Sequence, residues 1–368
     1  MRIAYIAVKG IPMSGGIEKY TDLLAQKLTM YGHEVTVYTT KHYGNKSGKM
    51  NGYTIRAVPS LKNKNLEKIT VVLSASVDQI FHKYDIVHYH ALGPSIFAFM
   101  ARIMRRKVVI QSHGIEYERS RWGKFGASIL KLLEKLSYNM GNELTVVSKP
   151  LKRYFLKQYG KETVFIPTAV EMPQQNKASV KSLEKYNIRP GEYYLFISRL
   201  VREKGAHYLI DAFKRLKTNK KLVIAGALNQ SDNYHKSLIG QAHDDDRIIF
   251  TGEVLGGDKD ALFTGAYAFC LPSELEGMSI ALLEAMSYRK VCIVSDIPEN
   301  VDVAQGRSVL FKTKNTGSLL EALEKVELFS AEQAAEIQNL AYEYVKENHS
   351  FDSIARQIEK LYMRLLEE

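Results

Sequence analysis

Two cations five residues apart are the first residues whose types and spacing suggest chemistry. Arg199 and Lys204 lie in SRLVREKGAHYL, a turn that follows the apolar run YYLFI, and Lys204 and Gly205 open a helical pattern. Fixed positive groups beside the amino end of a helix stabilise the negative charge that develops when a diphosphate departs. The segment therefore predicts a binding site for a diphosphate leaving group. The alternative is an ordinary charged turn.

Two carboxylates eight residues apart form a second candidate cluster. Glu276 lies in the turn after the strand-like run YAFCLPS, and Glu284 lies in the second turn of the following helix. Each carboxylate can accept hydrogen bonds from a vicinal diol, which suits a sugar or a ribose. Gly277 lets the backbone N–H groups of Met278 and Ser279 face the same ligand. The alternative makes Ser279 a helix cap and Glu284 a surface residue, but Glu284 lies in an apolar stretch where a carboxylate needs a partner.

The turn after the first strand-like run is rich in glycine. Gly10, Gly15 and Gly16 precede a helical pattern, and glycines there let backbone N–H groups approach an anion. The spacing disfavours a nicotinamide cofactor, because Pro12 stands where the dinucleotide fingerprint has its second glycine. His113 follows the run VVIQ at the same expected sheet edge, where a histidine can position or polarise a hydroxyl.

Asp244–Asp246 superficially resemble an acidic triplet that holds a divalent metal. They end a helical pattern just before RIIFTG, at the amino end of that strand and away from the expected site. The sequence has no HExxH, CxxC or EF-hand pattern. We therefore expect neither a metal nor a cofactor, with Arg199 and Lys204 replacing the metal cation.

Strand-like runs alternate with helical patterns through both halves of the chain, which is typical of parallel sheets with crossover helices. We expect helices over 17–31, 65–82, 94–105, 124–140, 205–216, 234–243, 258–265, from about 279, and three more over 316–367. A polar stretch near 171–178 reads as a linker. His88 and His90 alternate along one strand-like run and are interpreted as structural lining. The pattern predicts an α/β protein with two Rossmann-like domains.

The composition is that of an ordinary globular protein of 368 residues, with 45% hydrophobic and 25% charged residues. No apolar run reaches the length of a membrane span and the first residues lack a signal-peptide layout, so we expect a cytoplasmic protein. Cys270 and Cys292 lie in apolar runs and are expected to be buried, reduced thiols.

Basic residues are concentrated in the first half of the chain. Residues 1–170 contain 26 Lys and Arg against 11 Asp and Glu, a net charge of +15, whereas the rest has a net charge of −4. Such a basic half indicates an anionic partner: a phospholipid surface, a polyprenyl phosphate or nucleic acid. Solubility alone is the alternative. Nucleic acid is disfavoured because no recognisable nucleic-acid motif is present.

At these residues the chain resembles the family-4 retaining glycosyltransferases of the GT-B fold over essentially its whole length. EGMSIALLE, from Glu276 to Glu284, is similar to the family's E-x7-E signature, Arg199 and Lys204 to its phosphate-binding pair, and RIIFTGEV to the strand before its base-binding loop. KGIP and HGIEYERSRWGKF resemble a bacterial subgroup of rhamnosyl- and related transferases of surface polysaccharide synthesis. Ser279 stands where the family usually has proline, and AGALNQ lacks a second glycine, which leaves the donor open.

The resemblance implies two Rossmann-like domains that face each other across a deep cleft. Residues 1–170 would bind the acceptor, residues 171–350 would bind the nucleotide sugar, and the last helix, 351–368, would pack back on the first domain. It further implies metal-independent transfer of a hexose-type sugar from a UDP, GDP or dTDP donor to a glycan or polyprenyl-diphosphate-linked acceptor. The basic first half of the chain adds an expected peripheral contact with the plasma membrane.

The resemblance also assigns roles to individual residues. The catalytic set is His113, Arg199, Lys204 and Glu276. For the donor, it assigns the sugar to Glu276, the ribose to Glu284, the diphosphate to Gly16 and its neighbour Gly15, and the base to the loop at Val254, with Gly277, Met278 and Ser279 completing the site. Two alternatives stay open: a nucleotide-sugar epimerase or hydrolase of the same fold, and a non-catalytic binder of an anionic surface.

Overall fold

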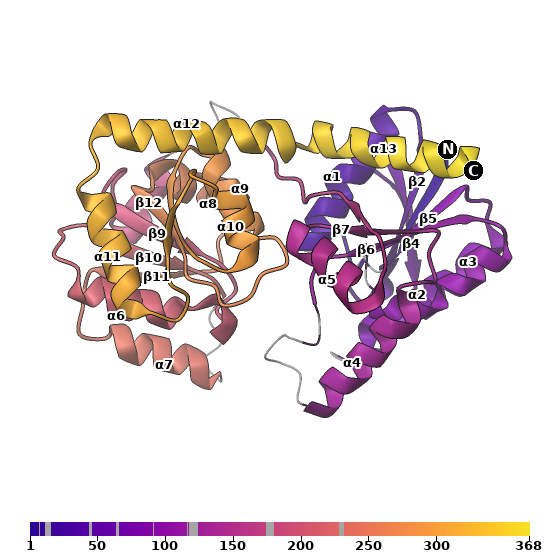
Figure 1. Ribbon diagram of the computed structural model, residues 1–368, viewed down its shortest axis with the longest axis horizontal. Helices are drawn as coiled ribbons and strands as arrows, with labels where there is room; N and C mark the ends of the chain where they lie inside the picture. The colour runs from indigo at the N-terminus through magenta and orange to yellow at the C-terminus, as the bar shows by residue number, and fades with distance from the viewer. Residues whose placement is uncertain are drawn as a thin grey trace. The chain divides into compact units, whose positions relative to one another are not determined.

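The computed structural model describes residues 1–6, 8–11, 16–43, 46–63, 66–90, 92–115, 117, 124–173, 180–227 and 232–368. The chain divides into two compact units (Figure 1). Unit 1 comprises Met1–Ala169 and Phe351–Glu368, and unit 2 comprises Val170–Ser350. Gly15 and residues 174–178 of the expected linker lie outside the described residues.

Unit 1 is built on a sheet of eight strands in the order β3-β4-β2-β1-β5-β6-β7-β8. The strands are β1 Arg2–Ile6, β2 Glu34–Thr40, β3 Gly48–Met50, β4 Tyr53–Val58, β5 Ile86–Tyr89, β6 Lys107–Ser112, β7 Glu143–Val146 and β8 Val164–Phe165. Neighbouring strands are parallel except β3 and β4, which form an antiparallel hairpin. Parallel pairing explains the apolar strands, because helices cover both faces of such a sheet.

The helices of unit 1 lie on the two sides of this sheet (Figure 1). They are α1 Gly16–Met30, α2 Glu67–Asp78, α3 Phe99–Ile103, α4 Lys124–Ser137, α5 Lys149–Tyr159 and α13 Phe351–Glu367, with 3₁₀ turns η1 Lys41–Tyr43, η2 Gln79–Phe81 and η3 Gly93–Ala98. Helices α1 and α13 share one hydrophobic core with β1, β2 and β4, which contains Leu24, Ile354 and Ile358. The last helix is therefore part of unit 1.

Unit 2 contains a parallel sheet of six strands in the order β11-β10-β9-β12-β13-β14. The strands are β9 Tyr193–Ile197, β10 Lys221–Ala225, β11 Ile248–Gly252, β12 Ala268–Leu271, β13 Val291–Ser295 and β14 Val309–Phe311. The helices are α6 Ala206–Arg215, α7 Asn233–Ala242, α8 Gly256–Gly265, α9 Ile280–Ser287, α10 Pro298–Ala304, α11 Thr316–Glu327 and α12 Ala331–Asn348, with 3₁₀ turns η5 Val180–Tyr186 and η6 Arg202–Lys204. This is the strand order of a dinucleotide-binding Rossmann fold.

Alternation along the strands of unit 2 separates two hydrophobic cores. Tyr193 and Leu195 of β9 belong to the core with α8, α9 and α12, whereas Tyr194 and Phe196 belong to the core with α6, α7 and α11. Successive side chains of a strand point to opposite faces, so a strand covered on both sides must be apolar throughout. Two Rossmann-like units are therefore present, and the prediction of the α/β fold is confirmed.

Local sequence signals set several helix ends. Ser148 caps the start of α5, because its hydroxyl accepts from the Leu151 N–H, and Gly160 caps the end in the left-handed conformation, with φ of 60°. Helix α12 begins with a capping box of Ser330 and Gln333.

Cys270 and Cys292 are free and buried, as expected. Within the described residues, no helix is long and apolar enough to cross a membrane.

Candidate active site

The carboxyl ends of β9 and β12 lie next to each other in the unit 2 sheet. The chain proceeds from β9 toward β10 on one side, and β12 starts the other half of the sheet on the opposite side of β9. Open α/β sheets bind their ligands beyond the carboxyl ends of such strands, where the order of the strands reverses. The two loops here contain Arg199 and Lys204 after β9, and Glu276 after β12.

Lys204 and Glu276 form the central contact of this edge. The Lys204 ammonium donates a hydrogen bond to Glu276 Oε1 at 2.5 Å, and the Ser273 hydroxyl donates to the same oxygen at 2.7 Å. The two charged side chains are only 13% and 6% exposed. Because a shielded pair of opposite charges is costly to separate, each side chain fixes the position of the other. Ser273 was not identified from the sequence, because a serine in a polar turn carries no distinctive signal.

Close backbone packing holds the two loops together. Gly205 has a φ of +71°, and a Cβ atom there would lie 2.0 Å from the carbonyl oxygen of Pro272. The Glu274 N–H donates to the Glu203 carbonyl oxygen at 2.8 Å, which adds a second link. Only glycine tolerates both the left-handed conformation and this approach. Gly205 therefore places Lys204 against the loop that carries Glu276.

Arg199 is not part of this ion pair. It is exposed and forms no ion pair with any residue that the structure describes. Its position directly after β9 puts it at the same sheet edge as Lys204. The guanidinium is thus available to a ligand, whereas Lys204 already has a protein partner.

Helix α9 presents the second carboxylate. Ser279 caps the helix, with its hydroxyl accepting from the Leu282 N–H at 3.4 Å, so the Ser279 side chain has the capping role that the sequence left as an alternative. Glu284 is bound by Lys259 of α8 at 2.6 Å, and the two side chains are 13% and 23% exposed. Lys259 is the partner that an acidic residue in this apolar stretch requires. Gly277 and Met278, which precede the cap, are partly exposed.

Val254 follows β11, two strands away from β9 on the same edge. Its side chain is 8% exposed and belongs to the hydrophobic core. Any contact of this residue with a ligand must therefore come from its backbone. The next side chain, Leu255, is 59% exposed.

Unit 1 has a histidine cluster at the carboxyl ends of β5 and β6. His113 is partly exposed, and its Nε2 lies 3.3 Å from Nδ1 of His90, which in turn lies 3.0 Å from Oε1 of Gln111. The ring of Tyr20, on α1, contacts both histidines edge-on. Gly16, at the exposed start of the same helix, is the described member of the glycine pair. The structure thus brings His113 and α1 to one sheet edge.

The cluster continues inward to the last helix. His88 Nδ1 lies 2.6 Å from the Tyr362 hydroxyl, which lies 2.9 Å from the Tyr5 hydroxyl. Burial lowers the pKa of His90 to about 3 and lowers the pKa of His88 as well, although Gln111 opposes the shift at both rings. Both histidines, which are 1% exposed, are therefore neutral near neutral pH. Their interpretation as structural lining agrees with this burial.

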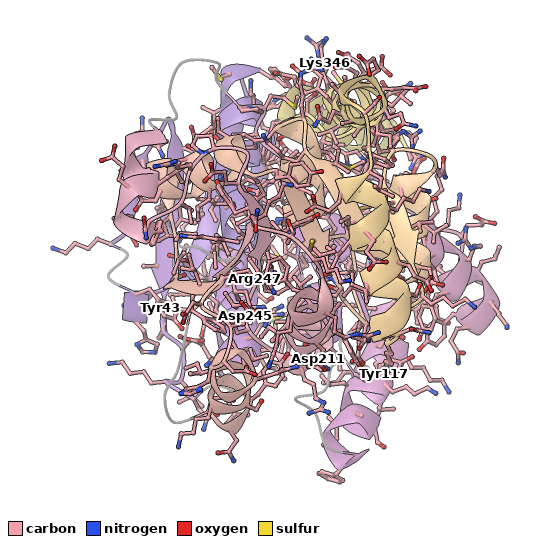
Figure 2. All side chains as sticks on the ribbon, turned by 90° about the vertical axis from the view of Figure 1, so that its left-hand side faces the viewer. Tyr43, Tyr117, Asp211, Asp245, Arg247 and Lys346 are labelled. Atoms are coloured by element: carbon pink, nitrogen blue, oxygen red, sulfur yellow. The ribbon has the colours of Figure 1, made fainter. Side chains whose placement is uncertain are left out.

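Two residues of the acidic triplet form ion pairs at the amino edge of the unit 2 sheet. Asp245 binds Arg247 at 2.7 Å, and the two side chains are labelled next to each other in Figure 2. Asp244 is bound by Lys214. In the part of the chain that the structure describes, no three His, Cys, Asp or Glu side chains gather in a way that could hold a metal ion.

Two family models match most of the chain. The model of glycosyltransferase family 4 matches residues 14–172, and the model described as glycosyl transferases group 1 matches residues 181–344. The first match covers most of the unit 1 sheet. The second covers every strand of unit 2 and both loops of the Lys204–Glu276 contact.

Individual proteins are similar over the same regions. The uncharacterized glycosyltransferase MJ1607 of Methanocaldococcus jannaschii is 25% identical over 100% of this chain and 99% of its own length. The putative teichuronic acid biosynthesis glycosyltransferase TuaC of Bacillus subtilis is 26% identical over 66% of this chain and 61% of its own. The crystal structure of HepE from Anabaena in complex with UDP and glucose matches with a TM-score of 0.80 at 16% identity, covering 99% of this chain and 100% of HepE.

Proposed function

Since the chain belongs to the family-4 glycosyltransferases of the GT-B fold, we propose that it moves a hexose-type sugar from a nucleotide diphosphate sugar to a glycan or lipid-linked acceptor. Cell-surface polysaccharide synthesis is the proposed setting, because the similar protein TuaC is named for teichuronic acid biosynthesis. A UDP-type donor is supported by the structural likeness to HepE, which was crystallised with UDP. GDP and dTDP sugars are alternative donors, and the thermal-shift screen described below includes them.

The shielded contact between Lys204 and Glu276 is the observation that carries this proposal. It places a cation and a carboxylate 2.5 Å apart at the carboxyl edge of a Rossmann-like sheet. At its anomeric carbon, a nucleotide sugar joins an anionic diphosphate to a neutral ring with several hydroxyls. One side therefore suits a cation, and the other suits a hydrogen-bond acceptor. Lys204 with Arg199 suits the diphosphate, and Glu276 suits the sugar hydroxyls.

The remaining donor contacts follow from the same sheet edge. Glu284 would accept hydrogen bonds from the ribose hydroxyls, and the loop at Val254 would contact the base. The backbone N–H groups of Met278 and Ser279 would bind a phosphate oxygen at the start of α9. Lys259 forms an ion pair with Glu284 as Lys204 does with Glu276.

The proposed reaction is a displacement on one face of the sugar, with retention of configuration. The bond from the anomeric carbon to the diphosphate oxygen breaks, and the bond to the acceptor oxygen forms on the same side. The acceptor proton passes to an oxygen of the departing diphosphate, whose charge Arg199 and Lys204 stabilise. No carboxylate nucleophile is required. On the acceptor side, His113 would hold the attacking hydroxyl or the sugar.

The first test is a thermal-shift screen of UDP, GDP and dTDP sugars with the full chain. We expect one nucleotide series to stabilise the protein by about 2.7 kcal/mol when the ligand is at 100 times its dissociation constant. Product analysis with a candidate acceptor then follows. Sugar release or isomerisation without an acceptor would instead indicate the epimerase or hydrolase alternative, and no stabilisation by any nucleotide would contradict the proposal.

The proposed chemistry requires no metal ion, and this is tested separately. We expect the rate of transfer to be unchanged in EDTA, because Arg199 and Lys204 supply the positive charge that a divalent ion supplies elsewhere. The measurement is release of the nucleoside diphosphate with and without the chelator. Activity that disappears in EDTA and returns with manganese would refute metal independence.

The basic first half of the chain supports an anionic acceptor carrier. Residues 1–170 have a net charge of +15, which suits a polyprenyl diphosphate and the membrane surface that holds it. We therefore include in the proposal a location on the cytoplasmic side, in peripheral contact with the plasma membrane.

A further inference from the structure

Helix α4 of unit 1 carries its apolar stripe on the solvent side. Phe125, Ile129, Leu132 and Leu136 follow one another at steps of four, three and four residues, which places them on one face of the helix. These residues, called the α4 stripe below, are 81%, 44%, 55% and 43% exposed. The apolar face of an amphipathic helix ordinarily packs on a core. In α4 it points away from the core.

Polar contacts on the opposite face fix this orientation. Glu134 is 5% exposed, and its carboxylate accepts hydrogen bonds from the hydroxyls of Tyr154 at 2.6 Å and Tyr159 at 2.8 Å. One turn further on, the Ser137 hydroxyl donates to the carbonyl oxygen of Gly93 at 2.9 Å. Turning the helix to bury the α4 stripe would break all three bonds and expose two partnered polar groups. The outward stripe is therefore a consequence of specific packing.

The surroundings of the α4 stripe are basic. Lys131 and Lys135 flank it on the same helix and are exposed. Arg102 of α3 donates to the carbonyl oxygen of Asn139, just after α4, and lies next to Ile103, which is 72% exposed. Arg105, just after α3, is also exposed, and the one acidic residue that the structure describes between 92 and 142 is the buried Glu134. The exposed apolar side chains thus have basic neighbours on α3 and α4.

We propose that the α4 stripe inserts into the interface of a bilayer that contains anionic lipids. Apolar side chains along one face of a helix, with lysines at its border, match the requirements of a helix that lies in the plane of a membrane. Negatively charged headgroups attract the neighbouring lysines and arginines. A second copy of the chain fits less well, because pairing two stripes would bring like charges together.

Membrane insertion of the α4 stripe rests on the lipid-linked acceptor of the proposed function. It adds the surface of unit 1 that would contact the lipid. Insertion would bury the four apolar side chains of the α4 stripe in the bilayer. The neighbouring lysines and arginines would at the same time contact the lipid headgroups. Binding should therefore require both anionic lipid and an intact α4 stripe. Each requirement can be removed separately.

The experiment is co-sedimentation of the full chain with vesicles, without donor or acceptor. Vesicles of phosphatidylcholine with phosphatidylglycerol are compared with vesicles of phosphatidylcholine alone, at low and at high salt. We expect binding to the anionic vesicles that falls at least about tenfold without phosphatidylglycerol or at high salt. Absence of binding to anionic vesicles at low salt would overturn the proposal.

Paired double variants test the surface itself. Ile129→Asp with Leu132→Asp should lower vesicle binding at least about tenfold, because two carboxylates would enter an apolar, anionic interface. The matched control is Ile239→Asp with Leu340→Asp on unit 2, whose native residues are 46% and 51% exposed. All four positions are exposed, so both double variants should keep the melting temperature of the parent chain. Equal binding by the two double variants would overturn the assignment to α4.

Two further readouts separate the other occupants. A molecular mass that doubles with concentration and returns to the monomer value in the α4 double variant would make the stripe an interface between copies and overturn the membrane proposal. Transfer to a water-soluble acceptor analogue is measured in parallel. Transfer without vesicle binding would overturn only this inference, whereas vesicle binding without transfer to any acceptor would contradict the proposed function.

Discussion

Lys204→Ala should lower the rate of sugar transfer by about 10²- to 10³-fold, the loss typical of removing one group that stabilises transition-state charge. The Lys204 side chain is 13% exposed and binds Glu276 at 2.5 Å, so its ammonium acts where water screens it poorly. The departing diphosphate develops its charge in the transition state, which is why the effect should appear mainly in kcat. The measurement is steady-state release of the nucleoside diphosphate.

A second variant separates lost chemistry from lost folding. Lys204→Ala leaves Glu276, which is 6% exposed, without its cation, and such a change can destabilise the protein by itself. Lys204→Met with Glu276→Gln removes both charges and should recover the melting temperature without recovering transfer. Lys214→Ala is the matched control, because Lys214 pairs with Asp244 at the opposite edge of the same sheet. Full activity in Lys204→Ala would remove Lys204 from the proposed mechanism.

The alternation of strands and helices in the sequence predicted most of the fold. Patterns near 205–216, 234–243 and 258–265 correspond to α6, α7 and α8 within two residues at each end. The hairpin of β3 and β4 was missed, although Asn51 and Gly52 between them are a strong turn signal and both have positive φ. Strands as short as β3 and β14 carry too few residues to show a period.

The segment 94–105 shows where periodicity is insufficient. The sequence predicted one helix, whereas the structure has a 3₁₀ turn over Gly93–Ala98 followed by the short helix Phe99–Ile103. Apolar residues at three-residue steps fit both kinds of helix, and Pro94 is compatible with the start of either. Only packing against the neighbouring helices decides between them.

The part of the candidate site that lies directly after β-strands was predictable from the sequence. Lys204 and Glu276 follow different strands of one parallel sheet, and the sheet edge brings them together. Lys259 was not predictable, because its contact with Glu284 depends on how α8 packs beside α9. The outward orientation of the apolar face of α4 was not predictable either. The helical period of the sequence does not show which face is buried, and the hydrogen bonds of the buried Glu134 carboxylate decide it.

Mild acid should lower the free energy of unfolding of unit 1, because unit 1 contains two buried histidines. His88 and His90 are each 1% exposed, and burial holds the pKa of His90 at about 3 and the pKa of His88 below its ordinary value. In the unfolded chain both rings take up a proton near pH 6.5. From pH 7 to pH 5 the unfolded state therefore binds more protons than the folded state, and stability falls as the pH falls. The expected loss is about 2 kcal/mol for His90, and His88 adds a further loss of the same sign.

The measurement is amide hydrogen exchange in β1, β5 and β6, corrected for the intrinsic dependence of exchange on pH. Protection of these amides reports the loss of stability of unit 1 between pH 7 and pH 5. His88→Gln and His90→Gln should each remove part of the pH dependence, whatever they do to stability at pH 7, because each removes one proton-binding site from the unfolded chain. His243→Gln, at an exposed position of unit 2, should leave the dependence in unit 1 unchanged. Protection that responds to pH equally in all three variants would show that the buried rings accept protons in the folded protein, so that the network from His113 to Tyr362 would be charged rather than neutral.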